Sequence, residues 1–294
     1  MKAKTLPVYN IEKFKPLCHE KDFYASTVSN HLKNNDFTSS PHKHNFFLVV
    51  LFTQGSGNHS VDFVNYDIKP GSIFMLSPGQ IHSWTLTEDT DGYIFFHNKD
   101  FYELNFSSNK LQDYPFYCSV YNSPTLILKA NDLQKSKSIF KEINLEYKQK
   151  QLIKFKRLFV LVELLYIDLL RLYLPQEQID KQNQDYLIKL RKLEGLINDN
   201  YKTIKSPAKY AEMMFLGIKQ LNRVCKECLN KSTSDIITDR IILEAKRLLI
   251  YSPFKIPEIA EQLGYTDISY FTRLFKKKNG ITPAAFIKTY SALL

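Results

Sequence analysis

The sequence predicts an α+β protein with a β-rich N-terminal domain and an all-α C-terminal domain. Short runs of apolar and β-branched residues, separated by Gly and Pro, fill the chain up to about residue 120, which is typical of a sandwich or barrel. From Asn131 onward the apolar residues recur at helical spacing. The length of 294 residues is enough for about two domains.

Positive charge is concentrated in the final third of the chain. From Tyr186 to Leu294 there are 19 Lys and Arg against 10 Asp and Glu, whereas the first 185 residues hold 21 against 20. A basic module joined to a near-neutral remainder is expected where one domain binds a polyanion such as nucleic acid.

The first domain is expected to span residues 1–174, with its strands within about residues 20–120. Phe46–Thr53 is a continuous apolar run between Pro41 and the Gly55-Ser56-Gly57 turn, which predicts a buried strand. Further strands are expected at His59–Val64, Ser72–Leu76 and Tyr93–His97. Several short strands with turns between them favour a sandwich or a barrel.

Helices are expected over about residues 131–174. The second of them, with an apolar stripe from Phe155 to Leu172, has a face so broad that it must be buried against the strands or a partner. This segment carries Glu163, Asp168 and Arg171 and is therefore not a membrane span. The N-terminus lacks the apolar core of a signal peptide, and four cysteines indicate no disulfide framework, so we expect a cytoplasmic protein without membrane contact.

Residues 175–185 are polar and rich in Gln, so a linker is expected there. The C-terminal domain, residues 186–294, should begin with a helix over Tyr186–Asn200. Ser206-Pro207 is an N-cap followed by a first-position proline, and Ile218–Leu229 is the next helix. A longer helix over Asp235–Tyr251 spans about 25 Å.

The stretch Ile256–Phe286 has the pattern of a helix-turn-helix. Pro257 suits the first turn of a short helix, and Gly264 can adopt the positive φ that ends it. Asp267 is an N-cap and Gly280 a stop for a second helix. Within that helix the residues expected to face inward are Ile268, Phe271, Leu274 and Phe275. The outer face is left polar and basic, and the helix before Ile218–Leu229 forms a second motif of this kind.

These motifs resemble the signature of the AraC/XylS family of bacterial transcription regulators. The residues that carry the resemblance are Ile259-Ala260, Gly264-Tyr265, Asp267, Ser269-Tyr270-Phe271, Arg273, Phe275-Lys276-Lys277, Gly280 and Thr282-Pro283. The upstream motif matches too, in LNRVCKE and in EAKRLL at Glu244–Leu249. Gly217 departs from the family, which usually has a Ser/Thr-type cap there.

The resemblance implies the organisation of the whole chain. PHKHNFFLVVLFTQGSG and PGSIFMLSPGQIH look like the small cupin-like β-barrel that precedes the DNA-binding domain in many such regulators. A homodimer contact through the helices at 131–174, a small-molecule effector in the barrel, and RNA polymerase as a partner are implied likewise. Activation is commoner than repression in the family.

We expect sequence-specific binding of double-stranded DNA, with two helices in successive major grooves. Arg223 and Arg273 suit guanine, Asn222 suits adenine, and Tyr270 or Thr272 can meet a thymine methyl or a phosphate. Lys219, Lys226, Lys276 and Lys277 are expected on phosphates. The full set of expected DNA-binding residues is Lys219, Gln220, Asn222, Arg223, Lys226, Ser269, Tyr270, Thr272, Arg273, Lys276 and Lys277.

His42, His44, His82 and Trp84 are the expected ligand-binding residues of the barrel. Three histidines around an open position can hold Zn or Fe, but the Glu that catalytic cupins place after the His-x-His pair is absent here. We therefore expect no metal and no cofactor. His42 and His44 would line the mouth of a ligand pocket or cap the barrel edge, His82 would pack or hydrogen-bond, and Trp84 would stack on a ligand or pack in the core.

Two other functions fit the composition. One is a metal-dependent cupin enzyme with an appended nucleic-acid-binding domain, which predicts a stoichiometric metal that depends on His44. The other is non-specific nucleic-acid compaction, which predicts binding that ignores sequence. No Ser-His-Asp set, P-loop or dinucleotide motif supports other chemistry, so we expect the chain not to be an enzyme.

Overall fold

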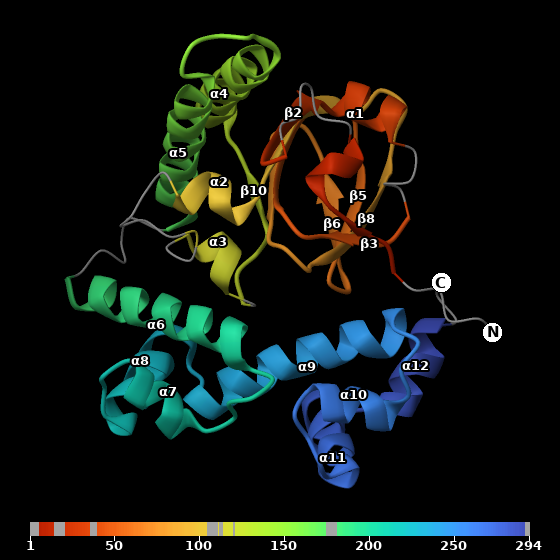
Figure 1. Cartoon of the computed structure of the whole chain (residues 1–294), viewed down its shortest axis with the longest axis vertical. Helices are drawn as coiled ribbons and strands as arrows, with labels where there is room; N and C mark the ends of the chain where they lie inside the picture. Colours follow the sequence, from red (N-terminus) through yellow and green to blue (C-terminus); the bar gives the residue numbers. More distant parts are fainter. Residues whose placement is uncertain are drawn as a thin grey trace. The chain divides into compact units, whose positions relative to one another are not determined.

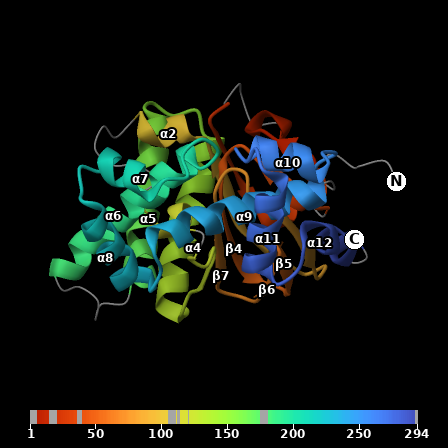
Figure 2. The ribbon, with the colours of Figure 1, turned by 90° about the horizontal axis from the view of Figure 1, so that it is seen from below.

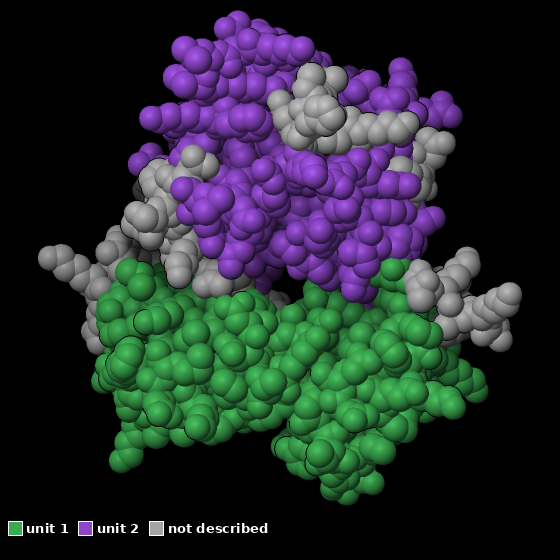
Figure 3. Space-filling view, viewed as in Figure 1, with its two compact units in different colours: residues 1–6, 179–294 green, residues 7–178 purple. Residues whose placement is uncertain are grey.

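The computed structural model (Figure 1) describes residues 6–14, 21–35, 40–104, 111, 114–119, 121–174 and 181–291. Contacts divide the chain into two compact units, one containing residues 7–178 and the other residues 179–294 (Figure 3). Within the described residues, the strands all lie in the first unit, and the regular elements of the second unit are helices. The α+β class expected from the sequence is therefore confirmed.

The N-terminal unit consists of two five-stranded sheets. The first has the order β1-β3-β8-β5-β6, formed by Val8–Tyr9, His42–His44, Ile81–Leu86, Gly57–Val61 and Val64–Ile68. The second has the order β10-β7-β4-β9-β2, formed by Thr125–Ile127, Ser72–Leu76, Phe47–Gln54, Asp91–His97 and Phe23–Thr27. No strand pair among the described residues joins the two sheets, so the expected closed barrel is corrected to two open sheets packed face to face.

Two hydrophobic clusters form the core of this unit. One lies between the sheets, and the other lies between the second sheet and the helices that cover it. Strand β4 contributes to both, since Leu48, Val50 and Phe52 point into the first cluster and Phe47, Val49 and Leu51 into the second. Burial on both faces explains why this strand reads as a continuous apolar run.

The strand predictions hold except in one place. Ser72–Leu76 forms as expected, and the other two runs shift by one or two residues. The segment His59–Val64, in contrast, is not one strand. Asp62 and Phe63 have φ of 47° and 72° and form a two-residue turn between β5 and β6. A hairpin turn with two positive φ values usually contains Asn-Gly or Asp-Gly. The pair Asp62-Phe63 therefore did not predict a turn from the sequence.

Helices α4 (Ala130–Lys148) and α5 (Lys154–Tyr173) pack together and cover the second sheet (Figure 1). The broad face of α5 is buried there, with Leu158, Val162 and Leu165 fully enclosed. Shorter elements complete the unit: the 3-10 helix Ile11–Phe14, α1 (Val28–Asn34), α2 (Lys99–Glu103) and α3 (Pro115–Cys118).

The C-terminal unit contains seven helices in its described part: α6 (Lys181–Asn200), α7 (Pro207–Met213), α8 (Ile218–Leu229), α9 (Thr233–Tyr251), α10 (Ile256–Gln262), α11 (Ile268–Asn279) and α12 (Pro283–Ser291). The pair α7–α8 lies at one end of α9, and α10–α11 lies at the other (Figures 1 and 2). The unit therefore presents two helix-turn-helix motifs joined by one long helix.

The expected linker at 175–185 overlaps this first helix. Residues 175–180 lie outside the described part of the chain, while residues 181–185 belong to α6. Lys and Gln are good helix formers, so a polar composition alone did not mark the end of the linker.

Candidate DNA-binding surface and effector site

Helix α11 is bounded by the two residues that its sequence suggests. Asp267 caps the start, its Oδ1 accepting a hydrogen bond from the backbone N–H of Tyr270 at 3.0 Å. Gly280 ends the helix in the left-handed region, with φ of 79°. Phe271 and Phe275 are fully buried and fix the inner face.

The outer face of α11 is exposed and basic. Ser269, Tyr270, Arg273, Lys276 and Lys277 are exposed, and Thr272 is half-buried. Ile268 was expected to face inward, but its side chain is 42% exposed. Ile268 is the first residue of α11, at the edge of the apolar stripe, where fewer core residues are available to cover it.

Helix α8 presents a matching surface. Leu221, Val224 and Cys225 are buried beneath it. The exposed residues on its outer side are Lys219, Gln220, Arg223 and Lys226. Its N-cap is Gly217, which makes no side-chain cap bond, so this helix start lacks the hydroxyl that usually stabilises it by about 1 kcal/mol over a residue without one.

Asn222 does not belong with this outward set. It is half-buried, and its Oδ1 accepts a hydrogen bond of 3.1 Å from the backbone N–H of Thr233. That N–H belongs to the first turn of α9, where backbone donors lack helical partners. This bond gives Asn222 a structural role at the start of α9, and the adenine-reading role expected for it stays a prediction.

The two motifs have turns of the same backbone geometry. In α10 the turn residue Gly264 has φ of 79°, and Tyr265 N–H bonds the carbonyl of Ala260 at 2.9 Å. After α7 the equivalent residue is Phe215, with φ of 57°, and Leu216 N–H bonds the carbonyl of Ala211 at 2.9 Å. Phe215 is also 92% exposed, so a bulky residue occupies a left-handed position without burial.

A charged contact holds α11 on α9. Lys278 Nζ lies 2.9 Å from Asp235 and 2.8 Å from Asp239. Asp235 also forms a capping box with Ser232 at the start of α9. The hydrogen bond from Lys278, followed by that from Ser232, holds the pKa of Asp235 well below its usual value. Lys278 was not singled out in the sequence, although its position seven residues after Phe271 places it on the inner side of the helix.

Arg223 and Arg273 are the exposed guanidinium groups of the two motifs. Among the described residues neither forms an ion pair, and the same is true of Lys219, Lys226, Lys276 and Lys277. Each motif therefore presents an arginine that can form two hydrogen bonds with a guanine edge, flanked by lysines that suit phosphates.

In the N-terminal unit, the structure brings His42, His44 and His82 together. His42 and His44 are alternate residues of β3, and His82 on β8 lies directly opposite His42. Their relative exposures are 1%, 5% and 2%, and that of Trp84 is 4%. His42 and His44, expected to line the mouth of a ligand pocket or to cap the barrel edge, are therefore buried, and their ligand-binding role stays a prediction. All four side chains lie on the face of the first sheet that points into the core.

A chain of imidazoles connects these residues. His44 Nε2 lies 2.6 Å from His82 Nε2, and His82 Nδ1 lies 2.9 Å from Nε2 of His59 on β5. His42 Nδ1 lies 2.7 Å from the carbonyl oxygen of Ser40. His59 was missed in the sequence, where it stood in a segment read as one alternating strand.

Burial controls the charge of this cluster. It lowers the pKa of His42, His44 and His82, and that of His59 to about 3. The four imidazoles are therefore neutral at pH 7. Several of their nitrogens are also unpaired, since His42 Nε2, His44 Nδ1 and His59 Nδ1 have no hydrogen-bond partner among the described residues. Each buried unpaired group costs about 1–3 kcal/mol.

A second buried polar network lies on the other side of the second sheet. His97 Nδ1 donates to the carbonyl of Asn98 at 2.8 Å, and Tyr166 donates to His97 Nε2 at 2.6 Å. Tyr117 lies 2.8 Å from the same hydroxyl of Tyr166. Burial lowers the pKa of His97 to about 4. This network ties strand β9 to α5 and α3 and has satisfied partners, unlike the cluster around His82.

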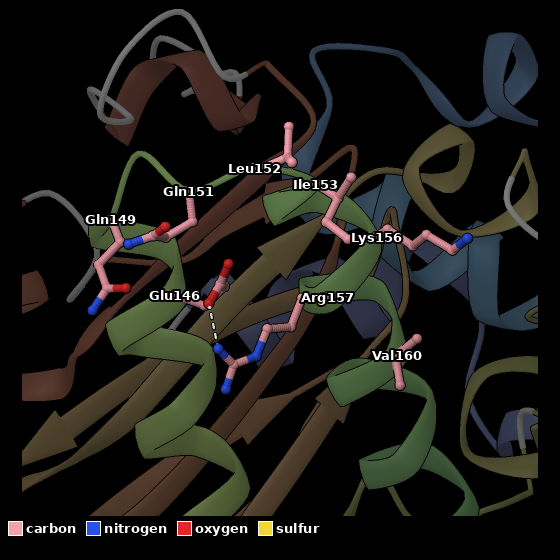
Figure 4. A pocket seen from close by; sticks show the side chains of 8 residues that line it. All are labelled: Glu146, Gln149, Gln151, Leu152, Ile153, Lys156, Arg157 and Val160. Atoms are coloured by element: carbon pink, nitrogen blue, oxygen red, sulfur yellow. Dashed lines mark hydrogen bonds and ion pairs between the residues drawn. The ribbon is translucent and has the colours of Figure 1, made fainter.

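A surface hollow lies where α4 turns into α5 (Figure 4). It is lined by Glu146, Gln149, Gln151, Leu152, Ile153, Lys156, Arg157 and Val160. An ion pair of 3.0 Å between Arg157 and Glu146 crosses it. The four expected effector residues are not among its lining, so the hollow and the histidine cluster are separate features.

Known families match both units. Residues 210–289 match the helix-turn-helix domain, and residues 26–104 match the AraC-like ligand binding domain. The chain belongs to the AraC family of transcription regulators. The first match contains both basic helices, and the second contains the four histidines of the buried cluster, so both candidate sites of this AraC-family regulator lie within the matched regions.

Relatives of this AraC-family regulator resemble it over most of their length. The uncharacterized HTH-type transcriptional regulator YfiF of Bacillus subtilis is 24% identical over 260 residues, covering 87% of this chain and 81% of YfiF. The HTH-type transcriptional activator RhaS of Mannheimia succiniciproducens is 23% identical over 247 residues, covering 82% and 87%. The solved structure of ToxT from Vibrio cholerae is 16% identical, covers 91% of this chain and 98% of ToxT, and has a TM-score of 0.43.

The helices of the described part are all too short or too polar to cross a lipid bilayer.

Proposed function

We propose that this regulator recognises its operator by placing α8 and α11 in successive major grooves of double-stranded DNA. The observation that carries the proposal is the pair of exposed basic helices at opposite ends of α9. With 19 residues α9 is about 28 Å long, close to the roughly 34 Å that separates successive major-groove faces on one side of the duplex.

The exposed residues divide into two roles. Arg223 and Arg273 read base edges, because a guanidinium can bond O6 and N7 of guanine together. The remaining contacts, to phosphates, sugars or thymine methyls, come from Lys219, Gln220, Lys226, Ser269, Tyr270, Thr272, Lys276 and Lys277. Phosphate contacts set affinity and its salt dependence, whereas the two arginines set sequence preference.

Selection of bound duplexes from a random pool tests this proposal. We expect one enriched site with two boxes about one helical turn apart. Arg273→Ala should then weaken binding by about 1–3 kcal/mol and relax preference at one base pair. Lys277→Ala is the matched control, since it should weaken binding to all sequences alike. Equal losses on all sequences in both variants, or no enriched site, would refute base reading by α11 and favour non-specific binding.

A homodimer through α5 is part of the proposal. Val160 and Leu164 on the outward face of α5 are 56% and 44% exposed, and the N-cap residue Ile153 in front of the helix is 69% exposed. A twofold interface brings the same patch of both copies together, so an apolar row of this kind suits a second copy of the chain. In sedimentation experiments Val160→Glu should shift the protein to monomer, while Leu172→Glu, on another side of the same helix, should not. A dimer that persists in Val160→Glu would argue against this interface.

The N-terminal unit is proposed to bind an effector at His42, His44, His82 and Trp84. Effector binding alters DNA binding only if the protein has two conformations that differ in their affinity for DNA and also in their affinity for the effector. The unpaired buried nitrogens of this cluster support a bound ligand. RhaS is named a transcriptional activator, which favours RNA polymerase as a further partner and the cytoplasm as the location. That name gives no support to an enzymatic role. Transcription from a promoter that carries the selected site, with and without this protein, would test the polymerase contact.

A further inference from the structure

We propose that His42, His44 and His82 form a binding site for a divalent transition-metal ion of the Zn²⁺ class, and that this ion is the effector of the N-terminal unit. The effector role rests on the proposed regulatory function. The metal site itself rests only on the geometry of the buried imidazoles.

The three histidines converge as metal ligands do. One ligand nitrogen from each lies within 4.8 Å of the others, and the ring centroids are 4.3 to 4.7 Å apart. A tetrahedral Zn²⁺ with Zn–N bonds of about 2.0–2.1 Å holds its nitrogens about 3.3 Å apart. The Nε2 atoms of His44 and His82, now 2.6 Å apart, therefore need to separate by about 0.7 Å. The most distant pair of ligand nitrogens, up to 4.8 Å apart, needs to approach by up to about 1.5 Å.

His42 already has the tautomer that a metal ligand needs. A carbonyl oxygen only accepts hydrogen bonds, so the contact of His42 Nδ1 with Ser40 O requires the proton on Nδ1. Nε2 then carries a lone pair, and this buried atom has no donor among the described residues. Metal-binding histidines commonly donate their second ring N–H to a backbone carbonyl in this way.

His82 has an outer partner of the same kind. With its Nε2 on a metal, the proton of neutral His82 lies on Nδ1 and is donated to His59 Nε2 at 2.9 Å. His44 then carries its proton on Nδ1. Each imidazole keeps one proton, so the ion enters through a change of tautomers and no proton has to leave. His59 is accordingly a positioning residue and not a ligand.

The distribution of unpaired atoms favours a bound ion over simple core packing. Seven buried side-chain atoms of the described residues have no hydrogen-bond partner, and four of them belong to His42, His44, His59 and Trp84. An ion on the three Nε2 atoms would give a partner to His42 Nε2, the one ligand atom that now has none, and would replace the contact between the Nε2 atoms of His44 and His82. Such concentrations of unpaired groups call for an unseen ligand or ion.

The donor set identifies the chemical class of the ion. Three imidazoles without a carboxylate suit Zn²⁺, Cu²⁺ or Ni²⁺ and not Mg²⁺ or Ca²⁺, which prefer oxygen. Three protein ligands also suffice for a site with one open position. The expectation of no metal relied on the missing Glu, and the convergence of the three imidazoles argues against it.

Metal titration of the full-length protein tests the site. The protein is stripped with a chelator and titrated with Co²⁺ and Zn²⁺ separately. We expect one ion per chain, with the strong visible absorption of tetrahedral Co²⁺, and a Zn²⁺ affinity about 100-fold lower or more in His42→Phe, His44→Phe and His82→Phe. His59→Phe should lower affinity by about 10–100-fold, as outer-shell changes do. The matched control His97→Phe, another buried histidine of the same unit, should bind as the wild type does.

Binding of less than one ion per chain, or equal affinity in all three ligand variants, would overturn the metal site. A second measurement needs no variant: Zn²⁺ must raise the thermal midpoint of the wild-type protein, since a ligand that binds only the folded state stabilises it, and Mg²⁺ must not. The absence of a Zn²⁺ shift would also overturn the site.

The effector role is tested on the selected operator by fluorescence anisotropy. Zn²⁺ should change the operator affinity of the wild type and not that of His44→Phe. An unchanged wild-type affinity would overturn the effector role while leaving the metal site in place. Loss of sequence preference in the DNA assay with metal binding intact would instead overturn the proposed DNA recognition, so the two failures are distinguishable.

Discussion

Replacing Phe215 with glycine should stabilise the C-terminal unit. Phe215 holds the left-handed position after α7 with φ of 57°, which costs a residue with a side chain about 1–2 kcal/mol. Glycine removes that strain but loses about 0.5–1 kcal/mol to the entropy of the unfolded chain. Because the ring is 92% exposed, its removal sacrifices little buried surface. The expected net gain is between about 0 and 1.5 kcal/mol, centred near about 0.7 kcal/mol.

Gly264 provides the opposite test at the equivalent position of the second motif. Its φ is 79°, and an added Cβ would lie 2.0 Å from the carbonyl oxygen of Lys202. Gly264→Ala therefore causes both backbone strain at a left-handed φ and a steric clash with the backbone. We expect the free energy of unfolding of the C-terminal unit to fall by about 2–3 kcal/mol or more. Two turns with the same hydrogen-bond pattern should thus respond with opposite signs.

Native-state hydrogen exchange on peptides from α7 to α11 suits this comparison. It reports on the C-terminal unit alone, whereas the melting curve of a chain with two units need not be two-state. If the C-terminal unit unfolds in a transition of its own, a gain of 1 kcal/mol in its free energy of unfolding would raise its thermal midpoint by about 4 °C. A less stable Phe215→Gly, or a tolerated Gly264→Ala, would refute the strain argument.

Three further outcomes are expected. Burial holds the pKa of His97 at about 4, below its unfolded value of about 6.5, so the unfolded chain binds more protons and stability falls as the pH drops below about 6.5. The loss from this group should reach about 2 kcal/mol at pH 5. Urea unfolding followed by Trp84 fluorescence should show a weaker acid dependence in His97→Phe, and an unchanged dependence would contradict the assignment. Asn222→Ala should destabilise the C-terminal unit by about 1 kcal/mol and leave the selected operator sequence unchanged; an altered base preference would restore Asn222 to the reading surface. Lys278→Met should lower stability by about 1 kcal/mol in hydrogen exchange of α9 and α11, whereas the exposed neighbour Lys276→Met should not, and equal effects would argue against the contacts with Asp235.

The helices of the C-terminal unit were predictable because local signals determine their ends. Asp267 and Gly280 bound α11, and the predicted span Ile218–Leu229 is α8 as observed. Caps and stops act within one turn of the chain, so they can be read without knowing what the helix packs on. Ile268 was misjudged because periodicity does not show where the core beneath a helix ends.

The arrangement of the sheets was not predictable in the same way. Whether strands close into a barrel depends on pairings between distant segments, such as β1 with β3 and β10 with β7. Edge strands of two or three residues carry too little pattern to be recognised.

The histidine site shows the same limit. The sequence brings His42, His44 and His82 to attention as residue types, but their convergence depends on the register that sets His42 opposite His82. A shift of one residue would move His82 to the other face of its strand. The partner role of His59 and the inward turn of Asn222 likewise depend on neighbours remote in sequence.

In the proposed DNA complex, helix α9 makes the second DNA contact an intramolecular event. Once α8 is docked, α11 is held at a high effective concentration near the next groove, and avidity exceeds the affinity of either motif. A flexible tether would increase avidity for operators with many different distances between the two boxes. Helix α9 has 19 residues, and Lys278 of α11 is paired with it, so avidity increases for one distance only. If the proposed complex forms, the length of α9 sets the spacing between the two motifs, and we expect operators to be discriminated by the distance between their boxes as well as by the bases within them.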